Sequence, residues 1–575
     1  MIMTTKEREP VFVNSLSYND IYSSDSKKSF FEYIKNISAE ELLFSVCSYT
    51  VQIHNQKLSN SLAQIYLYNL IEKGLPKQIQ KKVQTYINYI LSKRNHQFNF
   101  INNTSSLIFI QHVLMNAEKL PIKTKRSAEK DHNIFKAYLW CTQKWIDEQE
   151  KNKYIYSSNS IEDIIKFLLE YRLPVQELQE FKDFRPQFIK SSYFFKFCKS
   201  DKQFSDYLNI FLKSYNIEDS DSYLYHLLLF YMTNYETFNV DCYTTVSKNH
   251  QVALNFLETL AINNQPIKYD KDFKEIRNYP IYKASGSRYI YLSKNFLIDK
   301  IYQGIIFKMG IELVKEKAIY NNSRIKSSID FMSIFGQEFT ENNLFYRCME
   351  INFKNMDSMQ PGSELKKIIT AGEPDYYMRK KNDVFIFEFK NCLLNSEAKF
   401  SYDFNRIKEE IYIKFVKDRK GKDEGIMQII NTINAISQGT FKAIDDINNK
   451  STIIYPIIVY TDSSFGLEGI NHILNKEFKK HLKKYKFIVC NLTMINIDTL
   501  IKFQNLFEKD KIKLNKFIDE YHYLINTSSN IQDRLISFDR FLEDKLINNN
   551  IEIEIEIPTM MKEFMELIER FQEKK

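Results

Sequence analysis

The sequence predicts a mainly helical N-terminal part followed by a compact α/β part. The 575-residue chain is too long for one hydrophobic core, and its length suggests roughly two to four domains. It contains only 12 Gly and 11 Pro, so few residues interrupt long helices. Apolar residues recur at helical spacing over the first half, whereas strand-like apolar runs gather between residues 376 and 497.

The composition places the chain among folded globular proteins of the cytoplasm. Hydrophobic residues make up 44% and charged residues 26%, and the net charge of +8 is only a mild hint of a polyanionic partner. The seven cysteines are scattered without a CxxC pair, which indicates reduced thiols. The start MIMTTKEREPVF has no charged-then-apolar leader, and no run of 18 apolar residues occurs, so we expect neither secretion nor a membrane span.

The first half predicts a bundle of amphipathic helices. SAEELLFSVCSYTVQIH (38–54) and SIEDIIKFLLEYRL (160–173) each begin at a Ser that suits a helix N-cap. SDSYLYHLLLFYMTNYETF (220–238) is the most apolar segment, so we expect it inside the bundle. We assign 1–285 to a helical accessory domain that acts as a sensor, an oligomerisation module or a partner-binding module.

The second half predicts strands between helices. We expect a connecting segment over 286–325, with a strand at RYIYLS and then a long helix. Residues 326–505 form the predicted α/β domain, in the order helix, β-hairpin around RKKND (379–383), helix, strand, helix, strand. Residues 506–575 form a helical cap that includes the period-two strand NIEIEIEIP (550–558). We expect this strand to cap the domain, with pairing to a second copy as the alternative.

One strand of the predicted hairpin carries a glutamate in an apolar run. In VFIFEFK (384–390), alternation places three phenylalanines on one face and Val384, Ile386, Glu388 and Lys390 on the other. The turn RKKND brings the chain back, so the carboxylate of Asp375, thirteen residues upstream, can approach that of Glu388. Charged side chains are rarely buried without a reason, so this convergence calls for a function.

Two carboxylates beside a lysine suit phosphodiester hydrolysis with Mg²⁺. Hard oxygen ligands hold the metal, and the ammonium orients a water molecule or neutralises developing charge. A structural ion pair at a strand end is the alternative. The tripeptide alone is weak evidence, because Glu477-Phe478-Lys479 repeats it and Glu364-Leu365-Lys366 also fits, both at helical periodicity. Only residues 375–390 combine Pro-Asp, a hairpin-length spacer, a strand and a preceding helix.

The set Pro374-Asp375…Glu388-Phe389-Lys390 resembles the PD-(D/E)xK nuclease superfamily over about residues 325–500. The resemblance implies a restriction-endonuclease-like αβββαβ core. The resemblance also implies that Asp375 and Glu388 are ligands of Mg²⁺, with Mn²⁺ as an alternative, and that Lys390 is the catalytic lysine.

The family often adds an acid on the first helix and a glutamine on a later helix. Thr340 stands where the family's helix glutamate is expected, and of the neighbouring Glu338 and Glu341 we prefer Glu338 as a further catalytic and metal-binding residue. Gln428 is the candidate glutamine, although Thr432 replaces the tyrosine that often follows. A solvated or core-edge glutamine is the alternative.

Three basic clusters are expected to flank the acid pair and bind a nucleic-acid backbone. Arg379, Lys380 and Lys381 lie in the hairpin turn, Lys417, Arg419 and Lys420 in a later loop, and a third lysine cluster spans 476–486. Any one cluster alone is more typical of a solvated surface. We therefore predict a metal-dependent nuclease, an endonuclease acting on DNA rather than RNA, and by analogy a regulated effector of restriction or antiphage defence. A non-catalytic nucleic-acid-binding or interaction protein is the alternative.

Overall fold

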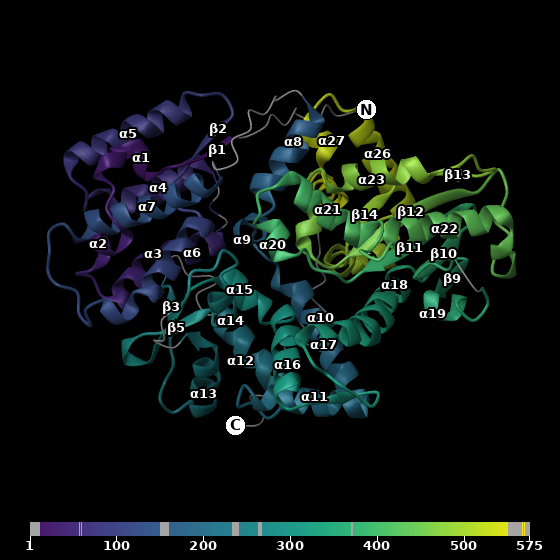
Figure 1. Cartoon of the computed structure of the whole chain (residues 1–575), viewed down its shortest axis with the longest axis horizontal. Helices are drawn as coiled ribbons and strands as arrows, with labels where there is room; N and C mark the ends of the chain where they lie inside the picture. The colour runs from purple at the N-terminus through teal and green to yellow at the C-terminus, as the bar shows by residue number, and fades with distance from the viewer. Residues whose placement is uncertain are drawn as a thin grey trace.

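The computed structural model describes residues 12–56, 58, 60–149, 160–232, 241–262, 267–369, 372–549, 566 and 569. A helical half and a sheet-centred half lie side by side (Figure 1). This arrangement confirms the expected α-rich part followed by an α/β part. Among the described helices, none combines the length and the apolar character that a membrane crossing requires. All seven cysteines are free thiols.

The N-terminal half consists mainly of helices that bury one apolar stripe each. In α11, Asp201 caps the helix by accepting a hydrogen bond from the N–H of Phe204, and Phe204, Leu208 and Phe211 point into the core at helical spacing. The elements in this half are α1 (Tyr18–Ile21), η1 (Ser24–Ser26), α2 (Phe30–Ile34), α3 (Ala39–Gln56), α4 (Ser61–Glu72), α5 (Lys77–Leu91), α6 (Asn103–Met115), η2 (Ala117–Lys119), α7 (Lys130–Gln149), α8 (Ile161–Phe167), η4 (Leu168–Arg172), α9 (Gln176–Gln179), α10 (Phe184–Ser200), α11 (Lys202–Lys213), α12 (Ser220–Met232), α13 (Gln251–Leu260) and α14 (Lys274–Asn278).

The helix at the centre of the bundle is α6 and not α12. Ten residues of α6 are buried around its circumference, and it packs between α3 and α7. Helix α12, which we expected inside the bundle, buries seven residues in the core, whereas Leu229 on its remaining side is 52% exposed. The most apolar segment therefore lies in the bundle, but it is not the helix that is buried all round.

Short strands also occur in this half: β6 is the strand expected at RYIYLS, whereas the periodicity did not indicate the others. Strands β1 (Phe12–Ser15) and β2 (His96–Asn99) pair in parallel, and β3 (Tyr243–Thr245), β4 (Ala261–Ile262), β5 (Ile281–Lys283) and β6 (Arg288–Tyr291) form a sheet in the order β3-β6-β5-β4. The β5–β6 hairpin spans residue 285, so the expected division at that residue falls inside this small sheet. The connecting segment continues through α15 (Lys294–Asp299), α16 (Gln303–Lys315), β7 (Ile319–Tyr320) and β8 (Ser323–Arg324).

The second half is built on a six-stranded sheet in the order β13-β12-β11-β10-β9, with β14 also paired to β12. Its strands are β9 (Ser358–Pro361), β10 (Tyr376–Lys380), β11 (Asp383–Lys390), β12 (Ile453–Tyr460), β13 (Ile488–Val489) and β14 (Thr493–Asn496). Strands β9, β10 and β11 form an antiparallel meander, and β12 runs parallel to β11. The predicted hairpin is confirmed, and β9 is an additional strand in front of it.

A long helical segment precedes the sheet, and other helices cover it. The leading segment runs through α17 (Ser328–Phe335), the π-helix η6 (Gly336–Phe345) and α18 (Tyr346–Asn352). The helices after β9 are α19 (Gly362–Leu365), α20 (Ser396–Lys399), α21 (Phe404–Phe415), α22 (Gly425–Gln438), η7 (Thr440–Ala443), η8 (Ser463–Gly466), α23 (Ile470–His481), α24 (Ile497–Lys502), α25 (Gln504–Glu508), α26 (Leu514–Thr527), α27 (Ile531–Leu535) and α28 (Phe538–Asn548). Helices α25 to α28 agree with the expected cap, whereas NIEIEIEIP lies outside the described residues.

The two faces of β11 enter two different cores, as its alternation predicts. Phe385, Phe387 and Phe389 join the core that is continuous with the N-terminal helices, and the ring of Phe389 stacks on Phe345 at 4.7 Å. Val384 and Ile386 join the other core, between the sheet and helices α21, α22 and α23. Burial on both faces holds β11 in one register, because a slip of one residue would exchange its faces.

A buried ion-pair network joins the two halves. Glu177 of α9 accepts from Arg277 and from Lys399 of α20, each at 2.6 Å. Arg277 also approaches Asp272 at 3.3 Å and Asp299 at 3.7 Å. Burial alone would raise the pKa of Glu177, but the charges of Arg277, Lys399 and Lys182 outweigh burial and hold that pKa well below its usual value.

Candidate active site

Asp375 lies directly before β10 and reaches across to β11. Its Oδ2 accepts a hydrogen bond from the backbone N–H of Phe389 at 2.7 Å, and its own carbonyl accepts from the N–H of Gly362 at 2.8 Å. The hairpin therefore brings the Asp375 carboxylate beside Glu388, as the spacing suggested. Because only one oxygen of Asp375 is needed for the bond to Phe389, the other oxygen is left for a further partner.

Glu388 is a completely buried carboxylate. Its exposed fraction is 0%, and neither Oε1 nor Oε2 has a hydrogen-bond partner among the described residues. Burial raises the pKa of Glu388 well above its usual value, and the charge of Asp375 raises it further, while Lys390 opposes both effects. A buried carboxylate without a hydrogen-bond partner costs several kcal/mol, so Glu388 is suited to bind a further positively charged group.

Lys390 ends β11 with its ammonium group held between two side chains of α22. Its Nζ donates to Glu424 Oε2 at 2.6 Å and to Gln428 Oε1 at 2.6 Å. Burial lowers the pKa of Lys390, but the charges of Glu388, Glu424 and Asp375 outweigh burial and the pKa is raised. Gln428 thus lies at the site as predicted, whereas Glu424 was missed. The signal available for Glu424 was its position one helical turn before Gln428.

The first-helix acid at the site is Glu341 rather than Glu338. Burial and then the charge of Asp375 raise the pKa of Glu341, which also accepts from the hydroxyl of Tyr346 at 3.2 Å. Glu338 instead accepts from the hydroxyl of Tyr320 on β7 at 2.6 Å. The expected preference for Glu338 is therefore not supported by the geometry.

The reason is the π-helical segment η6, which shifts the register of the helix. A π-helix holds more residues per turn than an α-helix, so the side chains of this segment lie at angles that differ from an α-helical count. The hydroxyl of Thr340 donates to the carbonyl of Phe335, five residues earlier, at 3.3 Å. Sequence spacing counted on an α-helical period could not anticipate this shift.

The oxygen donors of Asp375 and Glu388 are of the type that Mg²⁺ prefers. Mg²⁺ is commonly held by one or two carboxylates while waters and phosphate oxygens complete its coordination. Glu388 offers two unsatisfied oxygens and Asp375 one more beside it. In the part of the chain that the structure describes, no group of three or more His, Cys, Asp or Glu side chains is gathered closely enough to hold a metal by itself. Water and phosphate would therefore supply the remaining ligands.

The basic residues of the hairpin turn do not flank the acids. Lys381 and Lys390 lie at opposite ends of β11, and about seven residues at ~3.3 Å each separate Asp383 from Lys390, or roughly 23 Å. Arg379 is also paired with Asp445, and Lys380 approaches Asp510 at 3.7 Å. The lysines just before β13 lie at this same far end, because β13 pairs with the first residues of β12.

Only the loop that leads into α22 brings its basic cluster to the site. Lys417 and Arg419 precede Glu424 in this loop, but Lys417 approaches Asp423 at 3.6 Å and Arg419 approaches Glu410 at 3.6 Å. Lys420 is exposed. Lys366, which was not predicted, also lies close, since its charge lowers the pKa of Glu341. The expectation that all three clusters surround the acid pair was therefore wrong.

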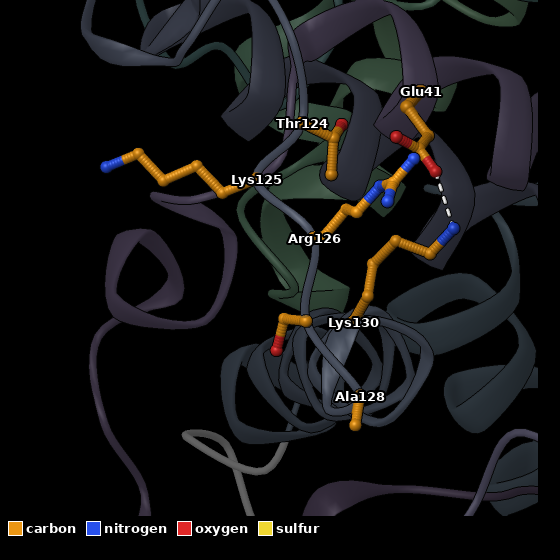
Figure 2. A pocket seen from close by; sticks show the side chains of 7 residues that line it. Glu41, Thr124, Lys125, Arg126, Ala128 and Lys130 are labelled. Carbon is orange, nitrogen blue, oxygen red and sulfur yellow. Dashed lines mark hydrogen bonds and ion pairs between the residues drawn. The ribbon is translucent and has the colours of Figure 1, made fainter.

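A separate polar hollow lies in the N-terminal half (Figure 2). Lys130 Nζ pairs with Glu41 Oε1 at 2.6 Å, and Thr124 accepts from the N–H of Ser38 at 3.0 Å. Figure 2 shows Arg126 pointing toward Glu41, whereas Lys125 extends away from it. Three basic residues face one acid there, so the hollow carries a net positive charge, but among the described residues that line it none is a buried carboxylate without a hydrogen-bond partner, as Glu388 is. We therefore place the candidate active site at β11.

Comparisons of the chain with protein-family models, with curated proteins and with solved structures give no match. The functional proposal therefore rests on the chemistry of the site.

Proposed function

We propose that this protein is a Mg²⁺-dependent nuclease that hydrolyses phosphodiester bonds, with Mn²⁺ as an alternative metal. The observation that carries the proposal is the buried, unsatisfied Glu388 between the carboxylate of Asp375 and the ammonium of Lys390. A structural ion pair would satisfy Glu388, and the structure instead directs Lys390 to Glu424 and Gln428.

The order of elements supports a restriction-endonuclease-like core. A helical segment precedes three antiparallel strands, helices α20, α21, α22 and η7 follow β11, and β12 then joins β11 in parallel. This order agrees with the αβββαβ arrangement that the PD-(D/E)xK resemblance implies. It also places the acids at one end of a strand that is buried on both faces, where their positions are rigid.

Each residue of the site has a distinct task in this proposal. Asp375 and Glu388 would hold the metal, which polarises the phosphate and lowers the pKa of an attacking water. Glu341, whose pKa responds to the charge of Asp375, would contribute through a bound water. Lys390 carries its positive charge beside the acids, where it can orient the water and stabilise charge that develops on the phosphate.

The proposed substrate is a nucleic acid. We favour DNA over RNA and cleavage within the strand over cleavage from its ends, as the resemblance implies. Lys366 and the loop that contains Lys420 supply positive charge near the site, which suits contacts to a phosphate backbone. We further propose, by analogy, a regulated role in restriction or antiphage defence. In this role the N-terminal half acts as a sensor, an oligomerisation module or a partner-binding module.

The test is cleavage by purified protein of plasmid, linear DNA and RNA with Mg²⁺, Mn²⁺ or EDTA. We expect metal-dependent cutting by the wild type and at least ~10³-fold slower cutting by Asp375→Ala and by Lys390→Ala, since each removes a group that stabilises the transition state. Equal cutting by all three proteins would place the active site elsewhere. Binding without cutting, under every metal condition, would favour the non-catalytic alternative.

A further inference from the structure

The ammonium group of Lys390 has two of its three N–H donors occupied. Glu424 and Gln428 accept them, each at 2.6 Å, and the side chain of Lys390 is only 11% exposed. An ammonium group is tetrahedral, so two fixed acceptors also set the direction of its third donor. Glu388 and Lys390 lie two residues apart on β11 and therefore leave the strand on the same face, so the lysine links the acid pair to α22.

The start of α22 is shaped around this lysine. Gly425 has φ 27°, and a Cβ at this position would lie 3.3 Å from Cε of Lys390 and 2.9 Å from the carbonyl oxygen of Phe415. Only glycine lets the helix begin this close to the lysine stem without strain. The approach places Glu424 and Gln428, one turn apart, on the side of α22 that meets Lys390.

The backbone of Glu424 is held on both sides. Its N–H donates to the carbonyl of Val416 at 2.9 Å, and its carbonyl accepts from the N–H of Met427 at 2.8 Å. Glu424 stands at the N-cap position of α22, yet within the described part of the chain no N–H of that helix donates to its carboxylate. The carboxylate is therefore committed to Lys390 and not to capping the helix.

We infer that Glu424 is a positioning residue that, together with Gln428, aims the ammonium group of Lys390 at the acid pair during phosphodiester cleavage. The inference rests on the proposed nuclease function and adds to it a residue outside the Asp375, Glu388 and Lys390 set. The lysine side chain is a flexible chain of four carbons, so without the two acceptors at α22 its ammonium group would sample many positions. A displacement of about 1 Å at a catalytic group can cost ~10²-fold in rate.

The first test is a comparison of cleavage kinetics. Glu424→Ala should lower kcat by about 10- to 100-fold and leave KM within about threefold, because the loss falls on the reacting centre and not on substrate binding. Glu424→Gln should lose less, since an amide oxygen still accepts from Lys390. Glu409→Gln, at an exposed acid of the neighbouring helix α21, is the matched control and should cut like wild type. Equal kcat for Glu424→Ala and wild type would overturn the inference.

The second test asks whether Glu424 acts through Lys390. The double variant Glu424→Ala/Lys390→Ala should cut within about twofold of Lys390→Ala alone, because the positioning residue has nothing left to position. A further tenfold loss in the double variant would show that Glu424 acts independently. Circular dichroism and thermal melting check that each variant is folded, and Glu424→Gln replaces Glu424→Ala if the latter unfolds.

The third test separates positioning from metal binding. Isothermal titration of Mg²⁺ into the protein without nucleic acid should give a Kd for Glu424→Ala within about twofold of wild type. A tenfold weaker Kd would make Glu424 a metal ligand and overturn the inference. If the wild type neither cuts nor binds Mg²⁺, the proposed function itself has failed. If the wild type cuts and Glu424→Ala cuts equally well, only the positioning role of Glu424 is refuted and the proposed function stands.

Discussion

Replacement of Glu388 by glutamine should stabilise the metal-free protein while it abolishes cleavage. Glu388 is fully buried and has no hydrogen-bond partner among the described residues, and burial followed by the charge of Asp375 raises its pKa well above 4.5. Because the folded-state pKa is raised, the stability contributed by this group is complete below about pH 4.5 and is lost as the pH rises. Glutamine has nearly the same shape and no charge to lose.

The gain in free energy of unfolding expected from Glu388→Gln has an upper limit. At pH 7.5, the raised pKa cannot cost more than the work of protonating an unfolded-state glutamate, which is about 4 kcal/mol. An unpartnered buried amide costs about 1–3 kcal/mol, so the net gain from Glu388→Gln is about 1–3 kcal/mol. With an entropy of unfolding near 2.1 cal/mol/K per residue, a chain of 575 residues that melts as one unit gains about 1–3 °C.

Differential scanning calorimetry at several pH values is the assay, with and without Mg²⁺. In EDTA, the advantage of Glu388→Gln over wild type should grow from pH 5 to pH 8. Mg²⁺ at 1,000 times its Kd should stabilise wild type by about 4.1 kcal/mol, and Glu388→Gln much less, so the order of stability should reverse.

The matched control is Glu477→Gln, in the second Glu-Phe-Lys tripeptide of the chain. Glu477 pairs with Lys480 at 2.6 Å and with His481 at 3.3 Å near the surface, so its loss costs only about 0–1 kcal/mol. Its pKa is lowered, so this cost appears above pH 4.5, the opposite sign to Glu388. A Glu388→Gln protein that is less stable than wild type in EDTA, or equally stable at every pH, would refute the reasoning.

Three further changes test other parts of the structure. Glu177→Gln leaves two buried cations poorly compensated and should cost about 3–5 kcal/mol at pH 7 by calorimetry; since the pKa of Glu177 is lowered, this cost should shrink as the pH falls below 4.5. Gly425→Ala, which meets backbone at 2.9 Å, should cost about 1–3 kcal/mol more than Gly421→Ala, whose Cβ finds open space among the described residues. Lys366→Ala should weaken nucleic-acid binding and lower its salt slope by about one in fluorescence anisotropy, whereas Lys381→Ala, at the far end of β11, should leave both unchanged.

Local patterns in the sequence were enough to predict the hairpin that carries Asp375, Glu388 and Lys390. The alternation of VFIFEFK predicted which side chains of β11 share a face, and the polar turn predicted the hairpin, because a strand has a fixed period of two. Together they placed Asp375 beside Glu388. Strand β6 was predicted at RYIYLS, but its neighbours β3, β4 and β5 in the small sheet were missed, since strands of two or three residues are too short to show a period.

Contacts between distant segments decided the rest. The π-helix brings Glu341 to the acids in place of Glu338, and its register depends on how the whole helix packs against the sheet. Glu424 reaches Lys390 across 34 residues because Gly425 permits a close approach of α22 to β11. The sequence by itself thus determined a hairpin that brings two acids and a lysine together at one end. Only the tertiary structure decided which further side chains and which basic residues lie at that end. Contacts between elements that are far apart in the sequence produce no periodic pattern from which they could be predicted.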